Sequence, residues 1–225
     1  IAAGGDPYSR EGVGFTDVGT FAVGDINNIA VAGSFELRDS QGNLLPGGTL
    51  EYFDTEWRTA TEISDGVFEV YTQATTVDLR MLYEGGIQQV DGVNVNDGYT
   101  YFTTLVTAEL FDSQGNGIEG GKAEYFTTEW LTLGTTDATG TATKELLPIT
   151  YSFRMIYAGG SLDVADQNTA IDPVVTFQTI LVTVELKDSQ GNGLAGGEVR
   201  SKNKGWKDFG TTDANGQVTG ELLPA

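Results

Sequence analysis

The sequence predicts an all-β protein made of tandem Greek-key β-sandwich units, the last of which is incomplete. Three observations predict this fold class. The phrase D-S-Q-G-N recurs at Asp39, Asp112 and Asp188, at spacings of 73 and 76 residues. The segments between the copies alternate apolar and polar residues with a period of two, as half-buried strands do. Glycine-rich turns separate these segments, and no segment combines a helical period with helix caps.

The repeat extends well beyond the turn phrase. Agreement over several separate stretches indicates duplication of one structural unit rather than a recurring turn motif. The matching pairs are GGTLEYFDTEW (47–57) with GGKAEYFTTEW (120–130), DLRMLYEGG (78–86) with SFRMIYAGG (152–160), and LGTTDATGTATKELLP (133–148) with FGTTDANGQVTGELLP (209–224).

Each unit is predicted to hold about seven short strands in roughly 75 residues. LVTVELKD (181–188) alternates and runs into the SQGN turn, while EYFTTEWLTLGTT (124–136) has the aromatic and Thr content of a half-buried strand pair. The dipeptide Asn215-Gly216 predicts a hairpin between two strands. TYSFRMIY (150–157) alternates again, and PVVTFQT (173–179) closes the unit.

The repeat period also predicts the domain organisation. The third copy has no counterpart of TYSFRMIYAGG or VVTFQT, so two core strands are expected to be missing from it. Such a sandwich exposes an apolar groove and unpaired strand edges. The expected divisions are an N-terminal extension (1–30), a first repeat (31–104), a second repeat (105–179) and an incomplete third repeat (180–225).

The order of motifs resembles a known family. D-x-x-G-N-x-(L/I)-x-G-G, then T-D-x-x-G with a later L-P, then an alternating aromatic strand, is similar to the prealbumin-like or Cna-B (SpaA)-type immunoglobulin-like domains of bacterial surface proteins. The resemblance covers residues 31–225 and implies a spacer, stalk or polymer subunit. Many such domains carry a Lys–Asn isopeptide bond. The matching positions here are Arg38, Phe111 and Lys187, which argues against a systematic bond of that kind.

Residues 1–30 have no partner in the repeat, yet they are apolar enough to form a strand. We expect residues 12–31 of one subunit to complete the third repeat, from Leu181 to Pro224, of the next subunit by donor-strand complementation. The expected donor residues are Val13, Phe15, Val18, Phe21, Val23, Ile26 and Ile29. The expected acceptor residues are Leu181, Val184, Leu186, Val199, Trp206, Phe209, Val218 and Leu222.

The unequal ends of the chain are also compatible with two alternatives to strand donation. In the first, the sequence, which starts with IAAGG rather than Met, is a processed or trimmed chain cut from a longer array in which another TYSFRM follows Pro224. In the second, the last unit has a loose, partly disordered end. The corresponding function is an adhesin or stalk fragment that binds a glycan or protein partner.

Charge and composition exclude several classes of function. With 12 Lys and Arg against 32 Asp and Glu, the formal net charge is −20, which repels nucleic acid and anionic membranes. The chain has no Cys and no His, so it lacks thiolate nucleophiles, imidazole bases and Cys/His zinc sites. No segment is apolar over the roughly 20 residues that a bilayer crossing needs. Because the sequence also lacks GxSxG and phosphate-binding loops, we expect no enzyme activity.

Acidic clusters offer two interpretations. The Asp residues of DSQGN and TTDxxG are expected to form Asx turns rather than calcium loops. Two less regular stretches, DGVNVND and LDVADQNTAID, are expected to be equivalent loops of the first and second repeats. They are the candidates for a Ca²⁺ site, with solvated acidic loops as the simpler alternative and no cofactor otherwise expected. The candidate ligands are Asp91, Asp97, Asp163, Asp166 and Asp172.

Aromatic and charged strand residues complete the set of expectations. The aromatic sets at residues 52–57 and 125–130 are a candidate glycan platform, with core packing as the alternative. Arg80 and Arg154 are expected to pair with neighbouring carboxylates, and Glu145 and Glu221 to be outward strand residues. The sequence as a whole favours an extracellular prokaryotic structural protein that polymerises with copies of itself, with a calcium-dependent surface-layer component as a third alternative.

Overall fold

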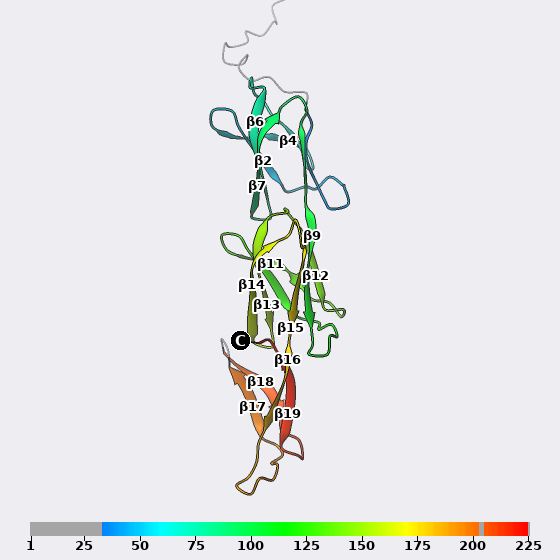
Figure 1. Ribbon diagram of the computed structural model, residues 1–225, viewed down its shortest axis with the longest axis vertical. Coiled ribbons are helices and arrows are strands. Elements are labelled where there is room, and N and C mark those ends of the chain that lie inside the picture. The colour runs from blue at the N-terminus through cyan, green and yellow to red at the C-terminus, as the bar shows by residue number, and fades with distance from the viewer. Residues whose placement is uncertain (1–32, 203–204, 225) are drawn as a thin grey trace, which may run out of the picture.

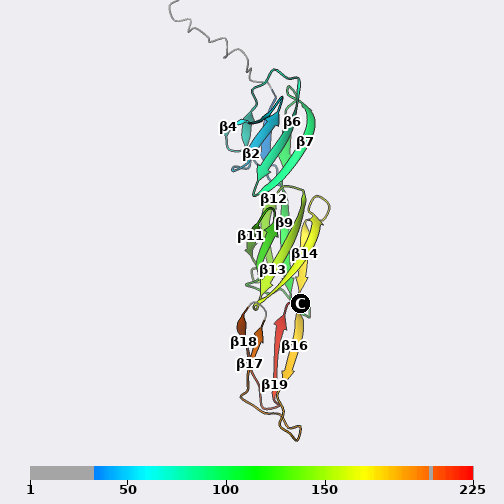
Figure 2. The same cartoon turned by 90° about the vertical axis from the view of Figure 1, so that its left-hand side faces the viewer.

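A computed structural model describes residues 33–202 and 205–224, and all of its regular elements are strands. The predicted all-β, immunoglobulin-like sandwich class is confirmed. The strands form three units that follow one another along the long axis of the molecule (Figures 1 and 2). We call them the first sandwich (β1–β8), the second sandwich (β9–β15) and the third unit (β16–β19).

The first sandwich has two four-stranded sheets, ordered β4-β5-β1-β8 and β3-β2-β6-β7. Three neighbouring pairs join strands that are not consecutive in sequence (β5-β1, β1-β8 and β2-β6), as in Greek-key folds. Its first and last strands, β1 and β8, run parallel and pair from Phe35↔Tyr99 to Arg38↔Phe102. The strands are β1 Phe35–Arg38, β2 Thr49–Phe53, β3 Trp57–Thr59, β4 Thr61–Ser64, β5 Val67–Glu69, β6 Thr76–Tyr83, β7 Gly86–Asn94 and β8 Tyr99–Phe102.

The second sandwich repeats this plan with the sheets β12-β9-β15 and β11-β10-β13-β14. Its first strand, β9, lies between β12 and the last strand, β15, as β1 lies between β5 and β8, and β9 and β15 are parallel. Its strands are β9 Thr104–Phe111, β10 Lys122–Phe126, β11 Trp130–Thr135, β12 Thr141–Leu146, β13 Thr150–Tyr157, β14 Gly160–Asn168 and β15 Val174–Gln178.

The third unit has only two pairs of strands, β16-β19 and β17-β18, among the described residues. The strands are β16 Ile180–Glu185, β17 Glu198–Lys202, β18 Trp206–Thr211 and β19 Gln217–Leu222. They correspond to β9, β10, β11 and β12, so the described part of the third unit has no counterpart of β13, β14 or β15. The sequence predicts two missing strands. These are the counterparts of the core strands β13 and β15, and the third, β14, is an edge strand with no buried residue.

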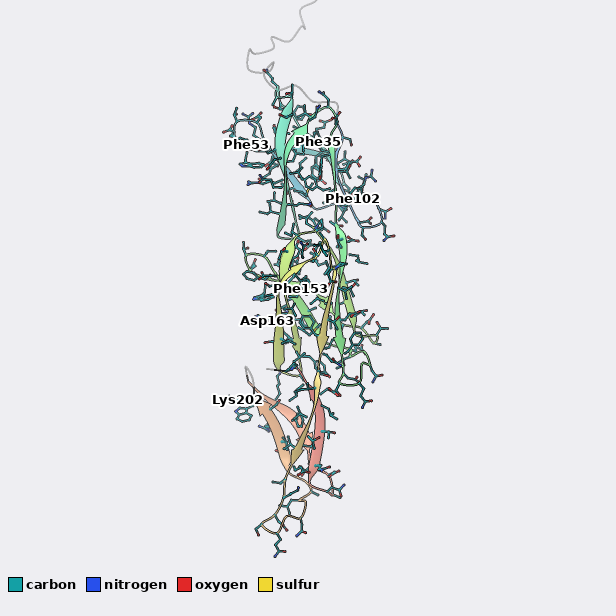
Figure 3. All side chains as sticks on the ribbon, in the orientation of Figure 1. Phe35, Phe53, Phe102, Phe153, Asp163 and Lys202 are labelled. Carbon is teal, nitrogen blue, oxygen red and sulfur yellow. The ribbon has the colours of Figure 1, made fainter. Side chains whose placement is uncertain are left out.

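Each complete sandwich has its own buried core between its sheets. Alternate residues of β1, β2, β5 and β6 line the first core, and alternate residues of β9, β10 and β13 line the second. Phe35 is 1% exposed in the first and Phe153 is 1% exposed in the second (Figure 3). The period-two pattern of the sequence therefore follows from burial of one face of each strand.

The three DSQGN turns have the predicted Asx geometry. Oδ1 of Asp39 accepts the backbone N–H of Gln41 at 2.9 Å and that of Asn43 at 2.8 Å, and Asp112 and Asp188 do the same in their turns. The Asn43 side chain donates to the second carboxylate oxygen, and this bond lowers the pKa of Asp39. The carboxylate satisfies the turn backbone and needs no metal to do so.

Candidate functional site

The third unit exposes the apolar residues that a complete sandwich buries. Within β16–β19 no residue is buried, whereas β9, β10 and β13 bury alternate side chains completely. Leu186 is 41% exposed, while its counterpart in the second sandwich, Leu110, is 0% exposed. One edge of β16 and one edge of β17 have no strand partner among the described residues. The result is an open groove between two strand pairs.

Most of the predicted acceptor residues belong to this groove. Their counterparts in the second sandwich, from Ala108 on β9 to Leu146 on β12, are buried core residues at 0–6% exposure. By this correspondence, most of these predicted residues lie on the core-facing sides of β17, β18 and β19. The others lie on the same side of the segment from β16 through the turn that follows it. These groove residues are Val184, Leu186, Val199, Phe209, Val218 and Leu222.

Two predicted acceptor residues lie on the outer faces instead. Leu181 is 54% exposed, and its counterpart Leu105 is still 44% exposed in the complete second sandwich. Its neighbour Val182 takes the inward position that corresponds to Val106. Trp206 is 65% exposed and corresponds to Trp130, whose ring packs under an arginine on the outside of its sheet. Leu181 is out of phase with Val184 and Leu186, which explains the error at this position.

A cavity of about 160 Å³, which we call the socket, lies at the end of the groove nearest the second sandwich. It is lined by Gly160, Ser201, Leu222 and Leu223, among others. At the joint between the two complete sandwiches, the corresponding space holds the ring of Tyr151 on β13. That ring lies 5.7 Å from Tyr125, and its hydroxyl would lie 2.5 Å from a Cβ at Gly86. The socket therefore corresponds to a position that an aromatic side chain of β13 fills at the other joint.

A second, more open depression of about 530 Å³ adjoins this socket. Phe209, Gly220 and Leu222 line it from the third unit, and Ala158 and Gly159 line it from the end of the second sandwich. The predicted donor residues, from Val13 to Ile29, lie outside the described residues.

At each joint between units, one carboxylate accepts hydrogen bonds from the neighbouring unit. We call this arrangement the clamp. Glu145 on β12 of the second sandwich accepts hydrogen bonds from the backbone N–H and the hydroxyl of Ser40 in the first sandwich. It also accepts the hydroxyl of Thr103, the single residue between β8 and β9. Lys144 adds an ion pair across the same joint, 3.1 Å from Glu84. One carboxylate thus holds a turn, a linker and a strand together.

The second joint repeats this clamp with Glu221 on β19. The Ser113 N–H and hydroxyl donate to Glu221 at 3.2 and 2.6 Å, and the Thr179 hydroxyl donates at 2.6 Å. Glu145 and Glu221 have the outward phase of their strands, opposite to Leu146 and Leu222, but the sequence does not predict that they bond the neighbouring unit. The signal is present in the sequence, because Glu-Leu-Leu-Pro and the Ser of DSQGN recur together, but a strand pattern does not reveal a contact between units.

Loss of the second clamp has an expected and local effect. In the Glu221→Ala variant, the Ser113 amide should exchange with solvent about fivefold faster, since a hydrogen bond of about 1 kcal/mol is removed. The Ser40 amide should not change, because Glu145 still holds it. Amide exchange measured by NMR tests this, and equal acceleration at both serines would contradict it.

Acidification should have the same effect without a substitution. The Ser113 hydroxyl, followed by the Thr179 hydroxyl, lowers the pKa of Glu221 from its ordinary 4.5. A lowered pKa in the folded state means that the clamp contributes fully above the ordinary value and is lost as pH falls through the lowered value. Ser113 exchange, corrected for its intrinsic pH dependence, should therefore accelerate only below about pH 4.5 in the unaltered chain.

Beside each clamp, a leucine of one unit packs in the core of the unit before it. We call this leucine the plug. Leu146 and Leu147 are adjacent and both 0% exposed, but Leu146 belongs to the core of the second sandwich and Leu147 to the core of the first. Leu223, the counterpart of Leu147, packs in the same way into the core of the second sandwich. The second and third units thus each contribute one core residue to the unit before them.

The aromatic sets divide between the core and the surface. Tyr125 is buried, while Phe126 and Trp130 lie on the outer face, 5.3 Å apart. The guanidinium of Arg154 lies 4.0 Å from the Trp130 ring centre and donates to both Asp163 oxygens at 2.7 Å. The predicted pairing of Arg80 and Arg154 with carboxylates is thus correct, because Glu51 accepts from Arg80 in the same way.

The candidate calcium ligands do not form one cluster of side chains. Asp91 lies on β7, and Asp163 and Asp166 lie on β14, so the expected loops are in part edge strands. Asp163 is bound by Arg154, and Asp172 accepts the backbone N–H of Val174 at 3.3 Å. Within residues 33–202 and 205–224, no group of three or more acidic side chains is placed to hold a metal ion.

Comparison with known proteins gives structural matches only. The sequence matches no protein family and no curated protein. The Bacillus anthracis TIE protein is 12% identical, with a TM-score of 0.27, over 88% of this chain and 44% of its own. A streptococcal ancillary pilin is 12% identical (TM-score 0.28; 85% of this chain and 86% of its own), and the major pilin subunit of Bacillus cereus is 9% identical (TM-score 0.25; 87% and 86%).

This chain spans less than half the length of the first of these proteins. Two of the three are pilins. The sandwich assignment itself rests on the strand order of this chain. The described residues contain no helix of the length and apolarity needed to cross a membrane.

Proposed function

We propose that this chain is a structural subunit of an extracellular prokaryotic filament or tubule, and that it polymerises head to tail by donor-strand complementation. The observation that supports this most is the third unit. Among the described residues, β16 and β17 each have one unpaired edge where their counterparts β9 and β10 are paired, and the apolar groove ends in a socket that suits an aromatic ring. An extended segment that pairs with these edges would supply main-chain hydrogen bonds and fill the groove with alternate side chains.

We assign the donor to residues 1–30 of a second copy. This segment is the only part of the chain outside the three repeats, and its apolar residues include Phe15 and Phe21, either of which fits the socket by chemistry. The corresponding division of the chain is 1–30 (donor), 31–104 and 105–179 (complete sandwiches) and 180–225 (acceptor). Two complete sandwiches lie between donor and acceptor, so a head-to-tail contact gives an open chain of subunits rather than a closed dimer.

The energetic scale suits a long-lived joint. Two inserted strands of about six residues bury several hundred Å² of apolar surface, worth on the order of 10 kcal/mol before the cost of ordering the segment. The proposed assembly needs no metal and no catalytic residue. Rigid clamps at Glu145 and Glu221 would keep successive units in line within each subunit.

A surface hollow supports a second candidate function. Phe126, Trp130 and Ala165 line a depression of about 310 Å³ beside Asp163 on the outer face of the second sandwich. Aromatic rings beside a carboxylate supply apolar contact area and a hydrogen-bond acceptor, which suit a sugar ring. An adhesin or stalk that binds a glycan in this hollow would not polymerise through its terminal units, which distinguishes it from a filament subunit.

Negative-stain electron microscopy of the intact chain and of a variant that lacks residues 1–30 tests the proposal. We expect filaments from the intact chain and dispersed particles from the variant, because the variant keeps the groove but has no strand to fill it. Filaments from both would place the joint elsewhere. Dispersed particles from both would favour a stalk or adhesin.

A further inference from the structure

The positive charges of the described residues are distributed unequally. Every Lys or Arg from the first sandwich to the turn that follows β16 contacts a carboxylate within 4.0 Å. Arg200, Lys202 and Lys207 have no such partner within residues 33–202 and 205–224, and all three are exposed. They lie on β17 and β18, and β17 has a free edge where its counterpart β10 pairs with β13. Figure 3 places Lys202 at the end of β17 nearest the second sandwich.

The complete sandwiches show what normally faces this edge. On β2, Glu51 is the cross-strand partner of Arg80 on β6; on β10, Glu124 is that of Arg154 on β13. In both, the acid is on the inner strand and the arginine is on the strand that the third unit lacks. Opposite charges at such directly opposed positions stabilise a strand pair, and like charges destabilise it.

The third unit reverses this arrangement. The 76-residue repeat places Arg200 where β10 has Glu124 and Lys202 where β10 has Phe126. A copy of the β6 or β13 strand would set its arginine directly against Arg200. The edge therefore disfavours the repeat's own strand and favours one that carries acids.

We propose that the free edge of β17 selects an acidic strand, with a carboxylate opposite Arg200 or Lys202, and that residues 1–30 of a second copy supply it. This inference rests on the proposed function and adds the chemistry by which the acceptor recognises its donor. Residues 1–30 contain four acids (Asp6, Glu11, Asp17 and Asp25) and one base, Arg10. In a chain of net charge −20, the same charges keep donor segments away from the acidic surface elsewhere.

Charge reversal in the full-length chain tests the inference. The acceptor variant carries Arg200→Glu and Lys202→Glu. The matched control carries Arg58→Glu and Lys122→Glu, the same change in net charge on the complete sandwiches. We expect the acceptor variant to raise the critical concentration for polymerisation, measured by sedimentation, at least about tenfold, and the control to change it less than about twofold.

A compensating variant distinguishes the loss of charge recognition from misfolding of the acceptor variant. Adding Glu11→Lys and Asp17→Lys to the acceptor variant should restore polymerisation, since the donor and acceptor charges are then exchanged. An acceptor variant that polymerises as readily as the wild-type chain would overturn the inference alone, as would a compensating variant with no recovery. A wild-type chain that stays monomeric would overturn the proposed function and the inference with it.

Discussion

Replacing Leu147 with Ala is expected to lower the free energy of unfolding of the first sandwich by about 2–5 kcal/mol, although Leu147 belongs to the second repeat. Its side chain is 0% exposed and packs in the first core with residues of β1, β2 and β6. Truncation removes buried methyl groups and leaves a cavity that the surrounding sandwich fills only in part.

The adjacent residue is a matched control. Leu146 is equally buried but packs in the core of the second sandwich. Leu146→Ala should therefore destabilise the second sandwich, and Leu147→Ala the first. Native-state hydrogen exchange resolves the two, because protected amides on β1 and β6 report on the first sandwich and those on β9 and β13 on the second. If both variants loosened the same sandwich, the plug would not hold the units together as described.

This plug also shows why the sequence predicts the units better than the joints. Period-two alternation and the Asx and Asn-Gly turns predict the strands of each unit, since they report local geometry and the burial of one face. The pair Leu146-Leu147 breaks the alternation. The role of this pair depends on contact with the neighbouring unit. At the same joint, Ser40 bonds Glu145 across 105 residues of sequence, and no local pattern contains such a contact.

The candidate site is predictable only in part, for a similar reason. The repeat shows which strands the third unit lacks, and alternation identifies most of the groove residues. The predicted phase of β16 is wrong at Leu181 because every residue from Ile180 to Val184 except Thr183 is apolar, so the pattern does not say which set faces inward. The segment of β14 reads as a loop because its outward edge position leaves it few buried residues.

Charge is a further signal that the strand pattern does not use. Arg200 and Lys202 fall in a segment that aligns with acidic and aromatic residues of the second repeat. Their role becomes visible only when the pairing of Glu124 with Arg154 shows which strand they would face. The sequence contains this information, but the register of a sheet is needed to extract it.

The absence of Cys from the sequence permits a clean cross-linking experiment on the donor strand. One cysteine is placed in the groove by Val199→Cys, and one at a time replaces Val13, Phe15, Phe21 or Val23 in the donor. A disulfide forms only where the two Cα atoms come within about 7 Å, so the bond reports direct pairing. A control carries the groove-side cysteine at Ile63 instead, which is exposed on the first sandwich.

Under mild oxidation, we predict a ladder of covalent multimers on a denaturing gel for at least one donor position, and none for the Ile63 control. A ladder shows that residues 1–30 of one copy lie against β17 of another. A single cross-linked band of monomer size would show that the chain folds back on itself. Filaments that form without any Val199 cross-link would contradict donor-strand assembly.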